Sequence, residues 1–190
     1  MKRSSHGSGA FYLAVMVLLG MQLVQGSAVK AADLPAMIVL VRHAEKAANP
    51  PDDPHLTAEG AKRARDLAAA VGAANLTAIV TTQLLRTRET AQPAATAFGL
   101  TINPIQVDPE QPDAHVNAML AALRKQSGGS VLVVGHSNTV PKLIQALGGP
   151  HLPEICESVY DRLFVVTPTP GKTLIVQSRY GAPSTEQNCN

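Results

Sequence analysis

Histidine and arginine side chains follow several short apolar runs of this sequence, and their types suit the binding of an anion. Arg42 and His43 come directly after one such run, and His136 follows another. Arg86 lies just past a third. Guanidinium groups pair with phosphate oxygens, and an imidazole near neutral pH can act as a nucleophile or a hydrogen-bond donor. These residue types indicate phosphate chemistry, provided that the fold brings them together.

Apolar strands and helices alternate along most of the chain. The predicted strands are residues 37–41, 76–81, 101–107 and 131–134, and the predicted helices are residues 58–71, 83–98, 114–126 and 139–147. Continuous apolar strands separated by helices are typical of an α/β three-layer sandwich, a mostly parallel sheet with helices on both faces. Ligands of such sheets bind outside the carboxyl ends of the strands. The predicted anion-binding side chains all lie at or near this edge.

Two β-rich runs near the C-terminus, residues 162–167 and 172–178, are predicted to form a hairpin because Thr-Pro-Gly separates them. The hairpin would return Cys189 toward Cys156. An even pair of cysteines can form a structural disulfide in an oxidising compartment. Two free buried thiols are the alternative.

The first 31 residues have the features of a secretory signal peptide. Two basic residues and no acid precede an apolar run at residues 10–24, and small residues follow. Cleavage fits after Ala28 or Ala31, of which we expect Ala31. A membrane anchor is less favoured, because the run is shorter than the ~20 residues that a spanning helix needs. We therefore expect export to the periplasm or the extracellular space, with residues 32–190 as one domain that has no stable membrane insertion.

The composition excludes several classes of protein. The chain has 190 residues, of which 45% are hydrophobic and 16% charged, which is the profile of an ordinary globular domain. Without Lys2, Arg3 and Lys30, which belong to the predicted leader, 13 basic and 14 acidic residues remain. A near-neutral chain without a basic run carries no electrostatic signature of nucleic-acid binding. We expect no nucleic-acid partner, and any anion must be bound by a local site.

Three motifs resemble, in order, the signature blocks of the histidine phosphatase superfamily, which has the phosphoglycerate mutase-like fold. They are VRHAEK at residues 41–46, TTQLLRTRETA at residues 81–91 and VLVVGHSNTV at residues 131–140. In that family the first block contains Arg-His-Gly with a nucleophilic histidine, the second a Ser/Thr-x-Leu-x-Arg pattern, and the third a second histidine. This sequence has Ala44 where glycine is usual. The change hinders close approach to phosphate only if the position needs a positive φ.

The resemblance implies a role for each matching residue. His43 would be the nucleophile, and Arg42, Arg86 and His136 would bind the phosphoryl group. No metal ion or other cofactor is implied. Three further histidines, His55, His115 and His151, match no motif and are predicted to be loop or surface residues.

A carboxylic acid is also needed, because the leaving group must receive a proton and water must later lose one. The candidates near the end of the third predicted strand are Asp108, Glu110 and Asp113. We favour Asp108 because it directly follows the strand, whereas the other two lie along a loop that proline residues interrupt. Asp108 could instead only cap the turn before Pro109.

The sequence thus predicts an exported, metal-independent phosphatase that acts on a phosphorylated small molecule, saccharide or protein. A secreted protein that binds a phosphorylated ligand without hydrolysing it would share the same phosphate-binding residues. A serine hydrolase using Ser137 is less favoured, because the only later histidine is His151 and no acid lies between the two. A mutase is also less favoured, because the chain is short and carries an export signal. The sequence does not indicate an oligomeric state.

Overall fold

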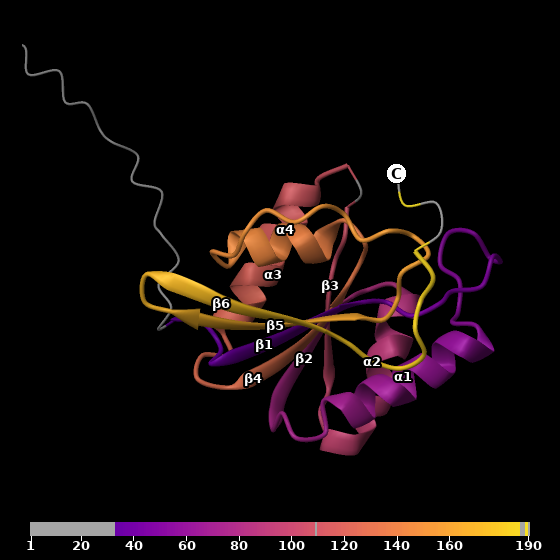
Figure 1. Cartoon of the computed structure of the whole chain (residues 1–190), viewed down its shortest axis with the longest axis horizontal. Coiled ribbons are helices and arrows are strands. Elements are labelled where there is room, and N and C mark those ends of the chain that lie inside the picture. The colour runs from indigo at the N-terminus through magenta and orange to yellow at the C-terminus, as the bar shows by residue number, and fades with distance from the viewer. Residues whose placement is uncertain (1–32, 109, 187–188, 190) are drawn as a thin grey trace, which may run out of the picture.

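A six-stranded sheet forms the centre of the molecule in the computed structural model, which describes residues 33–108, 110–186 and 189 (Figure 1). The predicted signal peptide lies outside the described residues. The strands are β1 (Met37–Arg42), β2 (Leu76–Thr82), β3 (Ile102–Ile105), β4 (Ser130–Gly135), β5 (Arg162–Thr169) and β6 (Lys172–Arg179). The helices are α1 (Ala58–Ala70), α2 (Leu85–Phe98), α3 (Pro112–Arg124) and α4 (Thr139–Ala146).

The strand order across the sheet is β3-β2-β4-β1-β5-β6. β1, β2, β3 and β4 run parallel to one another, whereas β5 is antiparallel to both β1 and β6. β1 and β4 lie in the middle of the sheet, so both of their faces are covered. This placement explains why their sequences are continuously apolar. The mostly parallel three-layer α/β fold predicted from the sequence is confirmed.

Each face of the sheet has its own hydrophobic core, because successive side chains of a strand point to opposite faces. Leu40 of β1 belongs to the core under α3 and α4, while its neighbour Val41 belongs to the core under α1 and α2. Leu123 of α3 and Leu67 of α1 contribute to these two cores and are fully buried. The helices thereby fix the positions of the strands, and through them the loops that follow the strands.

The carboxyl ends of β1 and β4 lie side by side, with Arg42 in register with Gly135. The backbone N–H of His43 continues the pairing by donating to the Gly135 carbonyl at 3.0 Å. A Cβ atom at Gly135 would lie 3.0 Å from Oγ1 of Thr139, at the start of α4. Glycine at this position therefore lets α4 begin directly against the strand end.

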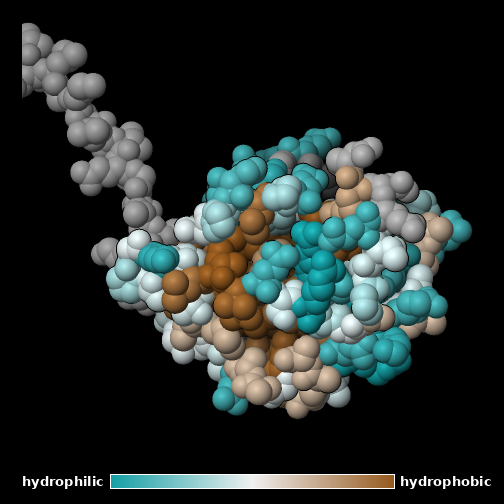
Figure 2. All heavy atoms as spheres, in the orientation of Figure 1, coloured by the Kyte–Doolittle hydropathy of each residue, from teal (hydrophilic) through white to brown (hydrophobic). Residues whose placement is uncertain are grey.

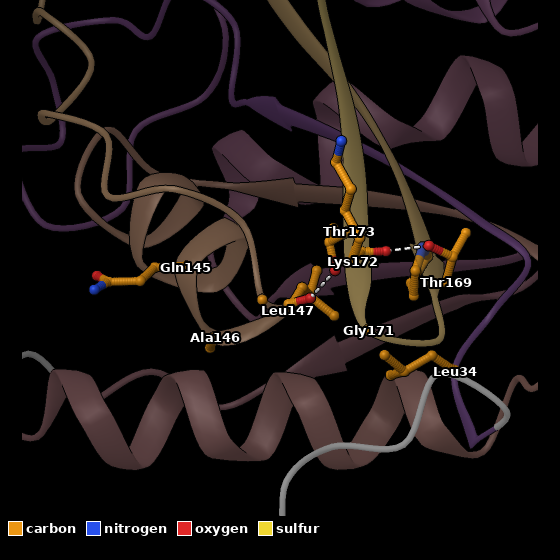
Figure 3. A pocket seen from close by; sticks show the side chains of 10 residues that line it. Leu34, Gln145, Ala146, Leu147, Thr169, Gly171, Lys172 and Thr173 are labelled. Atoms are coloured by element: carbon orange, nitrogen blue, oxygen red, sulfur yellow. Dashed lines mark hydrogen bonds between the residues drawn. The ribbon is translucent and has the colours of Figure 1, made fainter.

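A separate hollow of about 370 Å³ lies at the other end of the strands, between the β5–β6 turn and the end of α4 (Figure 3). Its polar groups bond to one another: the Thr173 hydroxyl donates to the Leu147 carbonyl at 2.6 Å, and Thr169 donates to Lys172. Lys172 is the one titratable side chain among the lining residues. This hollow lacks the residue types of a reactive site.

Hydrophobic residues also reach the surface over the β5–β6 hairpin, as Figure 2 shows. Leu174 and Val176 of β6 are 49% and 61% exposed. Within the described part of the chain, no helix has the length and apolar character needed to span a bilayer.

Candidate active site

His43 lies directly after β1 and is 4% exposed. Its Nδ1 lies 2.8 Å from the carbonyl oxygen of Ala44. A carbonyl only accepts hydrogen bonds, so Nδ1 carries the proton and Nε2 of the neutral ring keeps its lone pair. His43 is thereby held in the tautomer that a nucleophile attacking through Nε2 requires.

His136, directly after β4, is held by a chain of hydroxyl groups. Oγ1 of Thr87 donates to the carbonyl of Leu84 at 2.9 Å, so it must accept from Oγ1 of Thr82 at 2.8 Å. Thr82 then accepts from Nε2–H of His136 at 3.1 Å. The backbone N–H of His136 in turn donates to Oγ1 of Thr139 at 2.9 Å. The ring packs edge-on against His43, with 5.4 Å between the ring centroids.

Arg86, at the start of α2, has few interactions within the protein. Its nearest acidic partner is Asp53, 3.9 Å from Nη1, and its Nε is buried without a partner. Asp53 is mainly bound to the helix, because its Oδ1 accepts the backbone N–H of Leu85 at 2.8 Å. This bond replaces a side-chain cap, which Leu84 cannot supply. The guanidinium of Arg86 remains open to an added oxyanion.

Arg42 is 1% exposed and does not line the cavity that holds the two histidines. Its Nη1 donates to the carbonyls of Cys156, Glu157 and Val159, at 2.9, 2.8 and 3.2 Å. Its Nη2 forms an ion pair with the Glu157 carboxylate, and its guanidinium lies 4.3 Å from the ring centroid of Tyr160. In this structure Arg42 thus fixes the 156–159 loop. Its contact with phosphate stays a prediction.

Ala44 fits its position without strain. It is fully buried, and its N–H donates to Oγ1 of Thr90 at 2.9 Å. The only described residue other than glycine with a positive φ is Asn75. The position after His43 therefore does not require glycine, and alanine leaves the loop conformation intact.

One cavity of about 320 Å³ brings together most of the predicted site residues. His43, Arg86, Asp108 and His136 all line it. The cavity lies beyond the carboxyl ends of the parallel strands, as the strand order predicts. The structure therefore joins a nucleophile candidate, an open cation, a second histidine and a carboxylate in one place, and their chemical roles stay predictions.

The three acid candidates are separated by the fold. Asp108 lines the cavity, whereas Glu110 does not, and Asp113 lines a different hollow beside Lys142. Asp108 also holds its turn, because Oδ1 accepts the N–H of Glu110 at 2.9 Å and Oδ2 accepts from the side chain of Gln111 at 3.0 Å. Asp108 therefore both holds its turn and lines the cavity.

Several lining residues were not among the predicted site residues. Glu154 and Glu157 come from the loop between α4 and β5, and Lys46 follows His43. His115 also lines the cavity, and its prediction as a loop or surface residue was wrong, since it lies in α3 and is 3% exposed. Its neighbour Val116 belongs to the core, and a periodic apolar face around it was the available signal.

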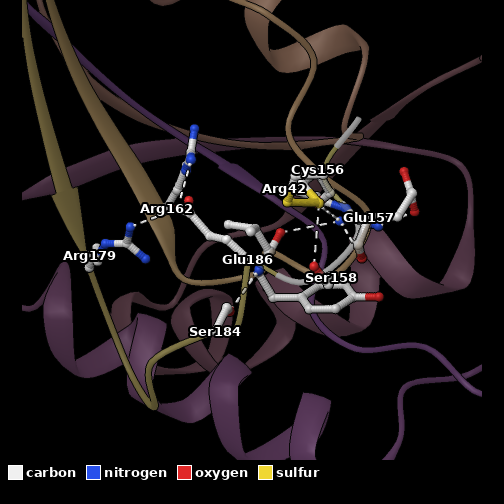
Figure 4. Close-up of a disulfide and its surroundings, with 11 residues drawn as sticks. Arg42, Cys156, Glu157, Ser158, Arg162, Arg179, Ser184 and Glu186 are labelled. Atoms are coloured by element: carbon white, nitrogen blue, oxygen red, sulfur yellow. Dashed lines mark hydrogen bonds and ion pairs between the residues drawn. A yellow bond between two sulfur atoms is a disulfide. The ribbon is translucent and has the colours of Figure 1, made fainter.

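The loop that binds Arg42 is also held by a disulfide. Cys156 and Cys189 are bonded, with their Cα atoms 5.2 Å apart, which is the pairing considered from the sequence (Figure 4). Ser184 accepts the N–H of Tyr160 at 2.9 Å through its hydroxyl. The C-terminal segment therefore supports the wall of the cavity from behind.

Burial is the main reason why the pKa values of His43 and His136 are low. It lowers the pKa of His43 to about 4, an effect that the nearby charges of Arg42 and Arg86 reinforce. Burial likewise lowers the pKa of His136 to about 3, and repulsion by Arg86 and by the protonated form of His43 adds to the effect. Both rings are neutral near pH 7. His43 is therefore available as a nucleophile without a general base to deprotonate it.

These pKa shifts predict that acid destabilises the fold. An unfolded histidine has a pKa near 6.5, so between about pH 7 and pH 4 the unfolded chain binds protons that the folded chain excludes. The free energy of unfolding should therefore fall as the pH falls through this range. Urea unfolding at several pH values measures it. The double variant His43→Asn/His136→Asn should show a shallower pH dependence, and an unchanged slope would contradict the assignment.

The described residues contain no cluster of three or more His, Cys, Asp or Glu side chains arranged to hold a metal ion. What the cavity offers is a neutral imidazole with a free Nε2 beside an open guanidinium. This combination can bind a tetrahedral oxyanion and attack its central atom.

Comparisons with known proteins agree with this geometry. Residues 38–110 match the family model of the histidine phosphatase superfamily (branch 1). No curated protein matches the chain significantly. The fold resembles that of the protein histidine phosphatase SixA complexed with tungstate, with a TM-score of 0.59 and 20% identity, over 75% of this chain and 96% of that one.

Two other structures show the same fold. One is Bacillus stearothermophilus YhfR, with a TM-score of 0.58, 18% identity, and coverage of 74% of this chain and 95% of that chain. The other is a phosphoserine phosphatase from Entamoeba histolytica in complex with 3-phosphoglyceric acid, with a TM-score of 0.56 and 14% identity, over 77% of this chain and 97% of that one.

The fold is thus the phosphoglycerate mutase-like α/β sandwich, with its candidate site at the carboxyl ends of the parallel strands. The match of residues 38–110 to the family model, together with this fold, agrees with the resemblance to the histidine phosphatase superfamily that the three sequence motifs indicate.

Proposed function

We propose that this protein is an exported phosphatase that hydrolyses a phosphomonoester through a phosphohistidine intermediate on His43. The observation that carries the proposal is the bond from Nδ1–H of His43 to the Ala44 carbonyl, which leaves Nε2 unprotonated in the cavity that Arg86 and His136 also line. The disulfide supports export, because such bonds persist in oxidising compartments. The leader predicted at residues 1–31 agrees with it.

The reaction proceeds in two steps. Nε2 of His43 attacks phosphorus, the bond to the leaving oxygen breaks, and that oxygen takes a proton from Asp108. The Ala44 carbonyl continues to accept from Nδ1–H, which favours the cationic phosphohistidine. Asp108 then removes a proton from water, which attacks phosphorus and releases phosphate and free His43. Arg86 and His136 stabilise the charge on the phosphoryl oxygens in both steps.

The substrate is proposed only as a class. The similar structures are named as phosphatases of protein histidine and of phosphoserine, which have very different leaving groups. A cavity of about 320 Å³ beside the reactive histidine lies at the lower end of the range of small-molecule sites, so it has room for the phosphoryl group and a substituent of about the size of one sugar ring. We therefore propose a phosphorylated small molecule, saccharide or protein side chain whose remaining part extends into solvent.

The direct test is a screen of the mature protein against sugar phosphates, phosphoserine, a phosphohistidine protein and p-nitrophenyl phosphate. We expect phosphate release from at least one substrate, with the same rate in the presence of EDTA. A protein that binds phosphorylated ligands without releasing phosphate would be the non-catalytic alternative. A rate that EDTA abolishes would contradict the metal-independent mechanism.

Replacement of Asp108 by asparagine should slow hydrolysis by a factor that depends on the leaving group of the substrate. We expect hydrolysis of an alkyl phosphate to slow by about 10²-fold, and that of p-nitrophenyl phosphate by only a few fold, because the phenolate leaves without a proton. Steady-state kinetics with both substrates measures the contrast. If Asp108 only held its turn, both rates and the melting temperature would fall together. A selective loss in Glu110→Gln instead would transfer the role to Glu110.

A further inference from the structure

The Nη2 atom of Arg42 is the part of this guanidinium that bonds to a side chain. Its Nη1 is saturated by three backbone carbonyls, which belong to the 156–159 loop. The partner of Nη2 is the carboxylate of Glu157 (Figure 4). A phosphoryl oxygen that bonds to Nη2 would therefore replace this carboxylate or lie directly beside it.

The backbone of Glu157 is fixed within its loop, whereas its carboxylate is held only through its bonds to the side chains of Arg42 and Ser137. The backbone carbonyl accepts from Arg42, and the adjacent Cys156 is fixed by its disulfide to Cys189. The side chain, in contrast, is 74% exposed and lines the cavity with His43 and Arg86. Rotation about its side-chain bonds alone would move the carboxylate into solvent, with no change in the loop.

We infer that the Glu157 carboxylate is a built-in competitor for phosphate at Arg42, so that this residue sets the affinity of the site for tetrahedral oxyanions. This inference rests on the proposed function of the cavity as a phosphate site and on the predicted role of Arg42 in binding the phosphoryl group. A phosphate dianion and a carboxylate on one guanidinium repel each other, so each weakens the binding of the other to Arg42. Release of product phosphate is favoured for the same reason, because Glu157 returns to Arg42.

The ion pair also accounts for the position of Arg42 in the absence of substrate. A buried guanidinium without an anion would be costly, and the carboxylate supplies the missing charge. Ser137, which follows His136, donates a hydrogen bond to the same carboxylate. Glu157 is therefore bound on both sides by residues adjacent in sequence to the two site histidines.

The test is inhibition by inorganic phosphate and by tungstate in Glu157→Gln, compared with the wild type and with Glu154→Gln. The amide introduced by Glu157→Gln keeps the size of the side chain and a hydrogen bond to Arg42 but lacks the charge. We expect Ki for both anions, and KM, to fall roughly tenfold in Glu157→Gln. Glu154→Gln removes the same charge from the same cavity without removing a bond to Arg42, so its shift should be much smaller.

The pattern of kinetic constants decides between this role and others. Unchanged Ki values in an active Glu157→Gln enzyme would overturn the inference, as would equal shifts in the two variants, which would reflect only the net charge of the cavity. A fall in kcat for alkyl phosphates with unchanged Ki would make Glu157 a proton donor and would equally overturn it. Absence of phosphatase activity in the wild type would instead contradict the proposed function itself.

Discussion

Replacement of His43 by alanine should abolish turnover, with a loss of more than about 10⁴-fold in kcat, since removal of a nucleophile typically costs this much or more. The variant retains Arg86 and His136, so it should still bind phosphate. Wild-type enzyme quenched during turnover of a ³²P-labelled substrate should carry label that is stable to alkali and labile to acid, as expected of a phosphohistidine. Mass spectrometry of the trapped protein should locate the label on His43.

A loss of activity alone would not establish this role, because His43 is buried and its removal leaves a cavity. His43→Asn keeps part of the volume and serves as the second variant, and circular dichroism and thermal unfolding check that each protein is folded. His151→Ala is the matched control, because this histidine is exposed and does not line the cavity. A labelled residue other than His43, or turnover by the folded His43 variants, would refute the mechanism.

The sequence was sufficient to predict the sheet and the side chains at its edge. β1 and β4 are continuously apolar because both of their faces are covered, and this pattern is visible without any tertiary information. The order of the strands was not predicted, and the structure places β1 beside β4, so the residues directly after these two strands meet. The positions of His43 and His136 therefore follow from local patterns and the rules of parallel sheets.

The partners of Arg42 could not be predicted in the same way. Its carbonyl acceptors lie 114 to 117 residues further along the chain, in a loop without periodicity. Glu157 is likewise an exposed acid in an irregular segment, where nothing in the sequence distinguishes it from a solvated charge. Such contacts depend on the path of a loop, which is set by the disulfide and by backbone bonds and has no signature in residue types.

His136 and Arg86 carry the second large expected effect. Each should lower kcat by about 10²- to 10³-fold when replaced by alanine, because loss of one donor to a charged transition state costs about 2.7 to 4 kcal/mol. Arg86→Lys should recover only part of the loss, because an ammonium group keeps the charge but lacks the planar fork. Steady-state and single-turnover kinetics with p-nitrophenyl phosphate measure these effects, since this substrate needs little help from an acid.

The hydroxyl chain behind His136 makes the prediction more specific. Thr82 accepts from Nε2–H, so neutral His136 has no proton on Nδ1 and can donate through that atom only after protonation, which a bound dianion favours. Thr82→Val keeps the shape of the side chain but removes the hydrogen-bond acceptor. It should lower kcat less than His136→Ala does, and it should shift the acid limb of the plot of kcat against pH. Normal kcat in folded His136→Ala would remove this residue from the site. An unaltered pH profile in Thr82→Val would show that the hydroxyl chain does not control the protonation of His136.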